Sequence, residues 1–147
     1  MSADARPAVA FVIQRYGAEI TGGSESLARA VAERLLAHYR VTVFTSCAVD
    51  YVTWRNALPE GTHDVNGVEV RRFPSVSERD LDAFNVLSEP LYRGPRSHDD
   101  EIEWLRRQGP EVPALVAALG LSETVIPEIY LNAIEWGNST VAMEGNS

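Results

Sequence analysis

The chain has 147 residues and a formal net charge of −8 at neutral pH. This acidity argues against general nucleic-acid binding, because neutralising phosphates requires a basic surface. All 13 basic residues are arginines, which excludes a P-loop lysine and Schiff-base chemistry. Cys47 is the sole cysteine, which excludes disulfides within the chain and thiolate zinc sites. No apolar run approaches the ~20 residues that cross a bilayer, and residues 1–7 lack a signal pattern, so we expect a cytoplasmic protein.

The first part of the sequence predicts a strand, a glycine loop, a helix and a second strand. Residues 8–13 are apolar at nearly every position, which is typical of a strand buried on both faces of a parallel sheet. A polar loop follows, and apolar residues then recur every four positions over residues 27–35, as on one face of a helix. Residues 41–45 are β-branched and aromatic. This order favours an α/β fold with a Rossmann-like, doubly wound, mostly parallel sheet.

The start of this helix has its own signals. Gly23 or Ser24 is expected to cap it, and Glu25 in its first turn suits the positive end of the helix dipole. Arg29 is expected on the solvent side, opposite the apolar stripe.

The middle of the chain predicts a hairpin between irregular segments and helices. Residues 46–64 are expected to be irregular, and Asn66-Gly67 is a strong two-residue turn signal. A short strand is expected from there to Phe73, followed by a helix over residues 81–91.

Helical signals continue in the next part of the chain. Ser97 and Asp100 form a capping box for a helix that Gly109-Pro110 ends. A short helix over residues 112–119 ends at Gly120. Residues 125–131 could form a strand, although a proline interrupts them, and residues 132–147 read as a loose tail. The expected organisation is one domain over residues 1–119 and a divergent C-terminal tail over residues 120–147.

Gly22 and Gly23 are the first candidates for a binding site. Two glycines before a helix let a ligand approach main-chain N–H groups at the positive helix end. The alternative is a tight turn that requires glycine and binds nothing, and the residues alone weigh equally for both. The dinucleotide fingerprint G-x-G-x-x-G is absent and no acidic residue ends the second strand, which disfavours a nicotinamide-type dehydrogenase.

A second candidate is the patch over residues 51–56, which combines aromatic, hydroxyl, guanidinium and amide groups. Such a combination suits a sugar ligand. A tryptophan in a long loop more often pins that loop to the core, however, so an anchoring role is favoured for Trp54.

The remaining reactive side chains have structural interpretations. His98 precedes three acidic residues, but consecutive positions spread around a helix, which favours a helix cap over a metal site. Cys47 is expected to be a small buried residue. Arg71 and Arg72 could meet an anion, although a strand beside acidic neighbours explains them too.

The order of these features resembles the N-terminal domain of a family 4 glycosyltransferase, a retaining enzyme of the GT-B type. The resemblance rests on the first strand, on Thr21-Gly22-Gly23-Ser24-Glu25, on the following helix and on the second strand. It covers about residues 7–119. Bacterial members are similar in particular at Thr53-Trp54-Arg55-Asn56, Leu58-Pro59, Gly61, Asn66-Gly67-Val68, Val70-Arg71-Arg72-Phe73-Pro74, Glu103-Trp104-Leu105 and Gly109-Pro110.

The resemblance implies two Rossmann-like domains that face each other across a cleft. The N-terminal domain mainly holds the acceptor, and the C-terminal domain holds the nucleotide-sugar donor. The loop that approaches the donor diphosphate would then be Gly22, Gly23, Ser24 and Glu25. Glu25 would orient the loop rather than contact phosphate, because two negative charges repel. Candidate acceptor-side residues are Arg15, Tyr16, Thr45, Trp54 and Arg55.

The resemblance also bounds the expected function. A chain of this length cannot hold both domains, so it implies a fragment of a retaining glycosyltransferase that is inactive alone and could pair with a separate donor-domain chain. No metal, no cofactor beyond the nucleotide-sugar substrate and no nucleic-acid partner are implied, no catalytic histidine can be assigned, and membrane association stays open. The alternative is a non-catalytic subunit or interaction module on the same scaffold. A different nucleotide-binding protein is less favoured, because the ribose-binding acid and P-loop lysine are absent.

Overall fold

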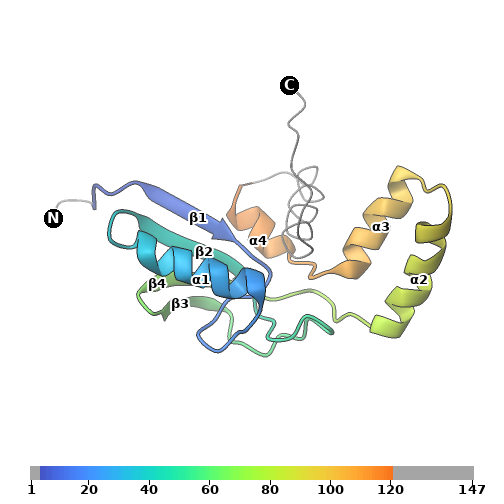
Figure 1. Ribbon diagram of the computed structural model, residues 1–147, viewed down its shortest axis with the longest axis horizontal. Helices are drawn as coiled ribbons and strands as arrows, with labels where there is room; N and C mark the ends of the chain where they lie inside the picture. Colours follow the sequence, from blue (N-terminus) through green and yellow to red (C-terminus); the bar gives the residue numbers. More distant parts are fainter. Residues whose placement is uncertain (1–3, 121–147) are drawn as a thin grey trace, which may run out of the picture.

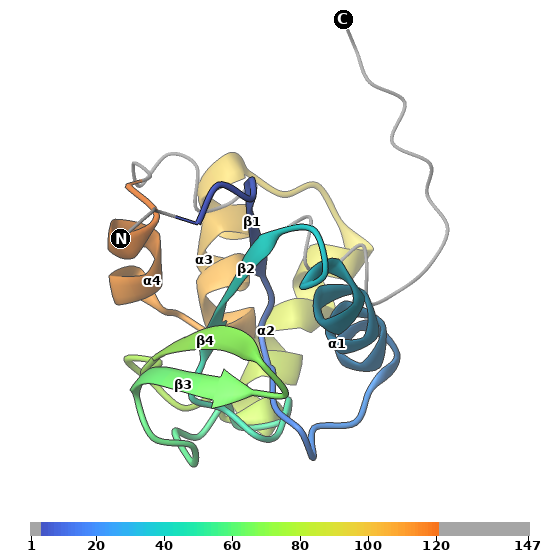
Figure 2. The same cartoon turned by 90° about the vertical axis from the view of Figure 1, so that its left-hand side faces the viewer.

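The computed structural model describes residues 4–120, which have an α/β fold (Figure 1). Four strands form one mixed sheet in the order β1-β2-β4-β3, in which β1 and β4 run parallel to β2 and β3 runs antiparallel to β4. Helices α1 and α4 lie on opposite sides of this sheet (Figure 2). The predicted α/β class is therefore confirmed. The elements are β1 (Ala8–Val12), α1 (Gly23–Leu35), β2 (Arg40–Ser46), β3 (Gly61–Val65), β4 (Val68–Phe73), α2 (Leu81–Arg93), α3 (His98–Gln108) and α4 (Pro113–Ala118).

The prediction that the first strand is buried on both faces is wrong. β1 stands at the end of the strand order and pairs with β2 along one side. Val9 and Phe11 are half-buried, whereas Ala8, Ala10 and Val12 on the other face are exposed. An unbroken apolar run gives no direct information on how many layers cover it, because burial depends on elements distant in the sequence.

The main core lies between the sheet and α1. Its buried residues come from the inward face of β2 and the β3–β4 hairpin, from the middle of α1 and from the segment after β1: Val41, Val43, Val65, Val68, Val70, Ala32 and Tyr16. On the opposite face, the rings of Phe44 and Phe73 stack with their centroids 6.4 Å apart. Each fully buried valine contributes roughly 1.5–3 kcal/mol of hydrophobic free energy, so this layer is a main source of the stability of the sheet.

The hairpin between β3 and β4 turns at the predicted dipeptide. Asn66 and Gly67 have φ values of 53° and 88°, the left-handed pair of a two-residue hairpin turn. The prediction that residues 46–64 are irregular is wrong in part, because β3 begins at Gly61 and pairs along β4. The sequence of β3 is largely polar, so its strand conformation depends on main-chain bonds to β4 rather than on its own apolar pattern.

Gly67 provides a test of this turn. Its φ of 88° is unfavourable for any residue with a Cβ, and a Cβ there would lie 3.2 Å from Leu36 Cδ1. We expect Gly67→Ala to lower the free energy of unfolding by about 1–2 kcal/mol, measured by urea denaturation. Gly94→Ala is the matched control, because Gly94 has φ −149° and its Cβ position is 3.9 Å from the nearest atom. Equal effects of the two substitutions would contradict the assigned turn.

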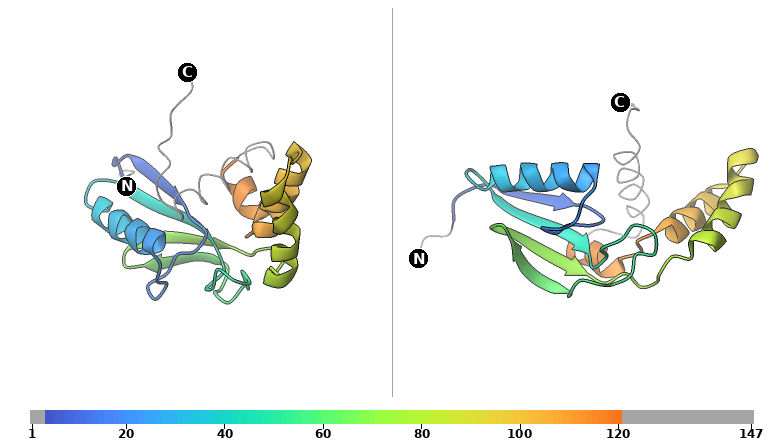
Figure 3. Two further views of the ribbon diagram at one scale, coloured as in Figure 1. Left: turned by 45° about the vertical axis from the view of Figure 1, so that its right-hand side comes forward. Right: turned by 60° about the horizontal axis from the view of Figure 1, so that its bottom comes forward.

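Helices α2 and α3 form a helical hairpin, residues 81–108, which we call the arm. It extends away from the sheet (Figure 3). The ring of Trp104 packs against Phe84 at 5.5 Å between centroids, and its Nε1 donates to Ser88 Oγ at 2.8 Å. The capping box of Ser97 and Asp100 is confirmed at the start of α3. The arm is therefore held together mainly by its own two helices.

Other sequence predictions have mixed outcomes. The short helix α4 ends as predicted before Gly120, which has φ +68°. The predicted strand over residues 125–131 and the tail over residues 132–147 lie outside the described residues. Within residues 4–120, no helix combines the length and the apolar character needed to cross a membrane.

Candidate functional site

The carboxyl ends of β1, β2 and β4 meet under residues 13–22, which we call the glycine loop. One main-chain and one side-chain hydrogen bond tie its start to β2: Ile13 N–H donates to Phe44 O at 3.1 Å, and the Ser46 hydroxyl donates to Gln14 O at 2.5 Å. Ligands of open α/β sheets bind outside the carboxyl ends of the parallel strands. The predicted Gly22–Glu25 segment therefore lies at the end of the sheet where a ligand site is expected.

Arginine side chains fix the glycine loop from two sides. Arg29 of α1 donates from Nη1 to the carbonyls of residues 17, 18 and 20 at 2.7, 3.0 and 3.2 Å. Arg72 at the end of β4 donates from Nη2 to the carbonyl of Tyr16 at 3.1 Å. The prediction that Arg29 faces solvent is wrong, because the loop folds back across α1 and its carbonyls need donors.

Arg15 and Glu25 form a buried ion pair beside the loop. Arg15 donates from Nε and Nη2 to Glu25 Oε1 at 3.0 and 2.6 Å, and each side chain is 10% exposed. Ser24 Oγ donates to the second carboxylate oxygen at 2.8 Å. Burial alone would raise the pKa of Glu25, but the hydrogen bonds from Ser24, the main chain and Arg15 outweigh it and lower that pKa. Glu25 is thus held in one orientation at the start of α1.

The two glycines have different surroundings. The N-cap of α1 is Gly22, not Gly23 or Ser24 as predicted, because the first helical bond runs from Ser26 N–H to Gly22 O. A Cβ at Gly22 would lie 2.1 Å from Glu25 Oε2, so the ion pair fills the space beside it. A Cβ at Gly23 would have no atom within 4 Å. The open main chain of this corner is therefore at Gly23.

The other predicted acceptor-side residues are split between core and surface. Tyr16 and Thr45 are 1% and 0% exposed, and neither hydroxyl has a hydrogen-bond partner among residues 4–120. Burial and nearby Glu33 raise the pKa of Tyr16 to about 12. Arg15 is in the buried pair, and Arg55 is exposed. The structure thus brings Arg15, Tyr16 and Thr45 to the glycine loop and leaves Arg55 apart.

Trp54 connects its loop to the arm. It is 3% exposed, and its Nε1 donates to Gln108 O at 2.7 Å. The guanidinium of Arg79 lies 5.4 Å from the ring centroids of both Trp54 and Phe84. This aromatic–guanidinium stack anchors the loop at the base of α3.

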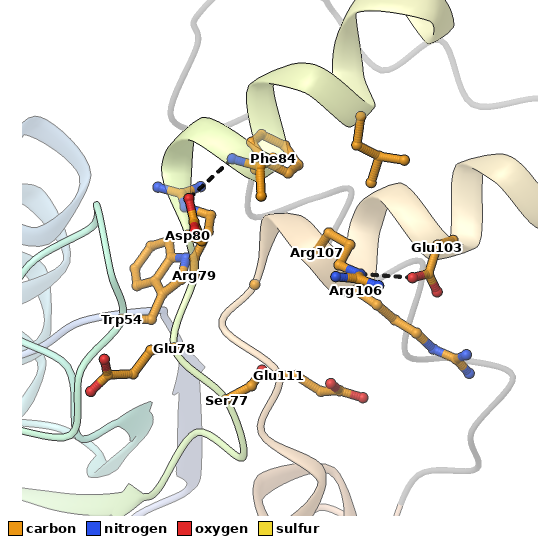
Figure 4. Close-up of a pocket in the computed structure, with 13 residues that line it drawn as sticks. Trp54, Ser77, Glu78, Arg79, Asp80, Phe84, Glu103, Arg106, Arg107 and Glu111 are labelled. Carbon is orange, nitrogen blue, oxygen red and sulfur yellow. Dashed lines mark hydrogen bonds and ion pairs between the residues drawn. The ribbon is translucent and has the colours of Figure 1, made fainter.

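A cavity of about 480 Å³ opens between the Trp54 loop and the arm (Figure 4). Its walls carry charges of both signs, including Glu103 and Arg107, which pair at 2.8 Å. Arg79 is part of the wall next to Trp54, and burial lowers its pKa. Sequence reasoning missed Arg79, because no local pattern marks a single arginine that stacks on rings from two distant segments. The remaining polar lining is Ser77, Glu78, Asp80, Arg106 and Glu111.

His98 lies at a helix start and Cys47 is buried, as their structural interpretations predicted. His98 is the first residue of α3, directly behind the Ser97 cap. Cys47 is 1% exposed, and burial together with Glu60 raises the pKa of its thiol. Residues 4–120 contain no group of three or more histidine, cysteine or acidic side chains placed to hold a metal ion.

No family model matches this chain, and no curated protein or solved structure matches it either. Function is therefore inferred from the residues and their geometry.

Proposed function

We propose that this chain is the acceptor-side wall of a retaining glycosyltransferase that uses a nucleotide-sugar donor. The observation that carries the proposal is the open main chain at Gly23, in the first turn of α1 and beside the ends of three parallel strands. A backbone that approaches a ligand this closely, at a positive helix end, suits the diphosphate of such a donor. The helices on both sides of the sheet support a doubly wound arrangement.

Two arginines beside the loop have no carboxylate partner. Glu25 is neutralised by Arg15, whereas Arg29 and Arg72 bind main-chain carbonyls and form no ion pair among residues 4–120. The loop also carries the exposed carboxylate of Glu19, so the attraction for a phosphate group comes from these individual donors rather than from a net positive charge.

One wall is not sufficient for catalysis. The leaving diphosphate must be stabilised from both sides of the sugar, which requires groups that face the glycine loop across a cleft. We therefore expect this chain to bind a nucleotide-sugar weakly and to transfer no sugar until a donor-binding domain is supplied. A cytoplasmic location is part of the same proposal.

The test is an NMR titration of the ¹⁵N-labelled chain with uridine-, guanosine- and adenosine-diphosphate sugars. We expect amide shifts that cluster at residues 22–26. Gly23→Val should abolish them while changing the free energy of unfolding by less than about 1 kcal/mol, because its side chain enters open space. Gly94→Val, a glycine substitution in a different part of the chain, is the control and should keep the shifts. The absence of shifts at millimolar ligand, or robust sugar transfer by this chain alone, would contradict the proposal.

A second candidate function is an interaction module. It is favoured by apolar side chains on α2 that face solvent, with Val86 73% and Tyr92 70% exposed. Exposed apolar side chains that form one contiguous patch can bind another protein. A chain that binds no nucleotide-sugar, but self-associates in a manner abolished by Val86→Asp, would favour this alternative.

A further inference from the structure

Two buried polar side chains lie side by side beneath the glycine loop. Thr45 of β2 and Arg72 of β4 are partners in the parallel register, next to the core pair Val43 and Val70. They occupy the last inward-facing positions before the two strands end. The inner face of the sheet is therefore apolar up to Val43 and Val70, and it ends in one hydroxyl and one guanidinium at the carboxyl ends of these strands.

Arg72 is a buried cation without a counter-ion. It is 8% exposed and forms no ion pair with a carboxylate among residues 4–120. Its one hydrogen bond in that part of the chain runs from Nη2 to Tyr16 O, and Nε has no partner. Burial lowers the pKa of Arg72. An uncompensated buried charge of this kind costs stability, and an anionic ligand would remove that cost by supplying the opposite charge.

Thr45 adds a second unused donor. It is 0% exposed, and its Oγ1 has no hydrogen-bond partner in the described residues. Buried polar side-chain atoms are almost always bonded. The described residues hold three exceptions, Thr45 Oγ1, Arg72 Nε and the Tyr16 hydroxyl. The first two lie on paired positions of neighbouring strands at the same end of the sheet, which points to one common acceptor group.

We propose that Arg72 and Thr45 bind a phosphoryl group that enters beneath the glycine loop. A phosphoryl group offers three acceptor oxygens, which match the guanidinium edge and the hydroxyl, and charge-assisted bonds from arginine to phosphate are among the strongest. Gly17 covers the site: a Cβ there would lie 3.6 Å from Arg72 Nη2. Entry of the ligand therefore displaces the turn at residues 17–20. The assignment stands on this pair of residues and does not require that the protein transfer sugars.

The test compares thermal unfolding in chloride with unfolding in inorganic phosphate and in pyrophosphate at equal ionic strength. At an anion concentration one hundred times Kd, the folding equilibrium constant of the wild-type chain should rise about a hundredfold. Arg72→Met should lose this response, and its stability in chloride should stay close to that of the wild type, because the removal of an unpaired buried charge offsets the loss of the hydrogen bond to Tyr16 O. Arg71→Met, on the exposed face of the same strand, is the matched control and should keep the response.

A second variant makes the test independent of how well Arg72→Met folds. Thr45→Val preserves shape and removes the unpaired hydroxyl, so it should fold and bind pyrophosphate about tenfold more weakly. No response in the wild type, or a full response in Arg72→Met or Thr45→Val, would overturn the assignment. A response to pyrophosphate without one to any nucleotide-sugar would keep this site and reject the proposed sugar transfer.

Discussion

Replacing Glu25 by alanine is expected to lower the free energy of unfolding by about 3–5 kcal/mol, the range measured when one partner of a buried ion pair is removed. The guanidinium of Arg15 would remain buried at 10% exposure without the carboxylate that it contacts twice. Urea denaturation monitored by tryptophan fluorescence gives the measurement. A loss below about 1 kcal/mol would show that the pair is not buried in solution.

Two further variants show whether the loss comes from an unpaired buried charge. The double variant Arg15→Met/Glu25→Leu should recover most of the stability, because well-packed apolar side chains replace a buried pair at little cost. Glu103→Ala is the surface control. It breaks a helical pair whose side chains are 46% and 65% exposed, and such pairs contribute about 0.3–0.5 kcal/mol.

The same pair predicts the direction of the pH dependence. The pKa of Glu25 is lower in the folded protein than its usual 4.5, so the unfolded chain binds its proton more readily. The stability that Glu25 contributes is therefore present above pH 4.5 and is lost as the pH falls through the lower folded pKa. The difference in stability between the wild type and Glu25→Gln should shrink across that range of pH.

Replacing Gly22 by alanine should be the second most damaging change, at about 2–3 kcal/mol, the cost of overpacking a filled site. The new Cβ would lie 2.1 Å from Glu25 Oε2 and 3.3 Å from Arg15 Nη2, so the carboxylate must leave its partners. The effect should nearly vanish in the Glu25→Ala background, because both changes disrupt one contact. Full additivity of the two substitutions would show that Gly22 acts in another way.

Gly23→Ala is the control one residue further along. Its Cβ meets nothing within 4 Å, and alanine loses less main-chain entropy than glycine on folding. We expect the variant to be unchanged or more stable by up to about 1 kcal/mol. The contrast between adjacent glycines, measured by the same denaturation, distinguishes a structural glycine from one that leaves a surface open.

Local signals account for what could be predicted of the fold. The helical span of α1, the Asn66-Gly67 turn and the Ser97 capping box each depend on a few neighbouring residues, so the sequence contains the information directly. The predicted apolar stripe of α1 is wrong in part, because Leu27 and Val31 are 57% and 37% exposed. The burial of β1 and the existence of β3 depend instead on which strand lies beside them. That information is non-local, and no window of a single sequence provides it.

The candidate site shows the same division. Gly22 and Gly23 are visible as a pattern, but the structure shows that Glu25 fills the space at one and leaves the other free. Arg72 could have been found by extending the strand alternation of Val68 and Val70 by one step, which places it on the inner face. The role of Arg29 could not have been predicted, because its partners are carbonyls of a loop whose path is set by tertiary structure.

The arm has a consequence for how the molecule opens. Its two helices pack mainly on each other, and its base is held by Trp54, Arg79 and the carbonyl of Gln108. A substructure with few ties to the main core behaves as a separate cooperative unit. Amide protons of α2 and α3 are therefore expected to exchange through a partial unfolding that leaves the sheet intact. The hydrogen bond from the Trp54 indole to Gln108 O would contribute to the free energy of this opening.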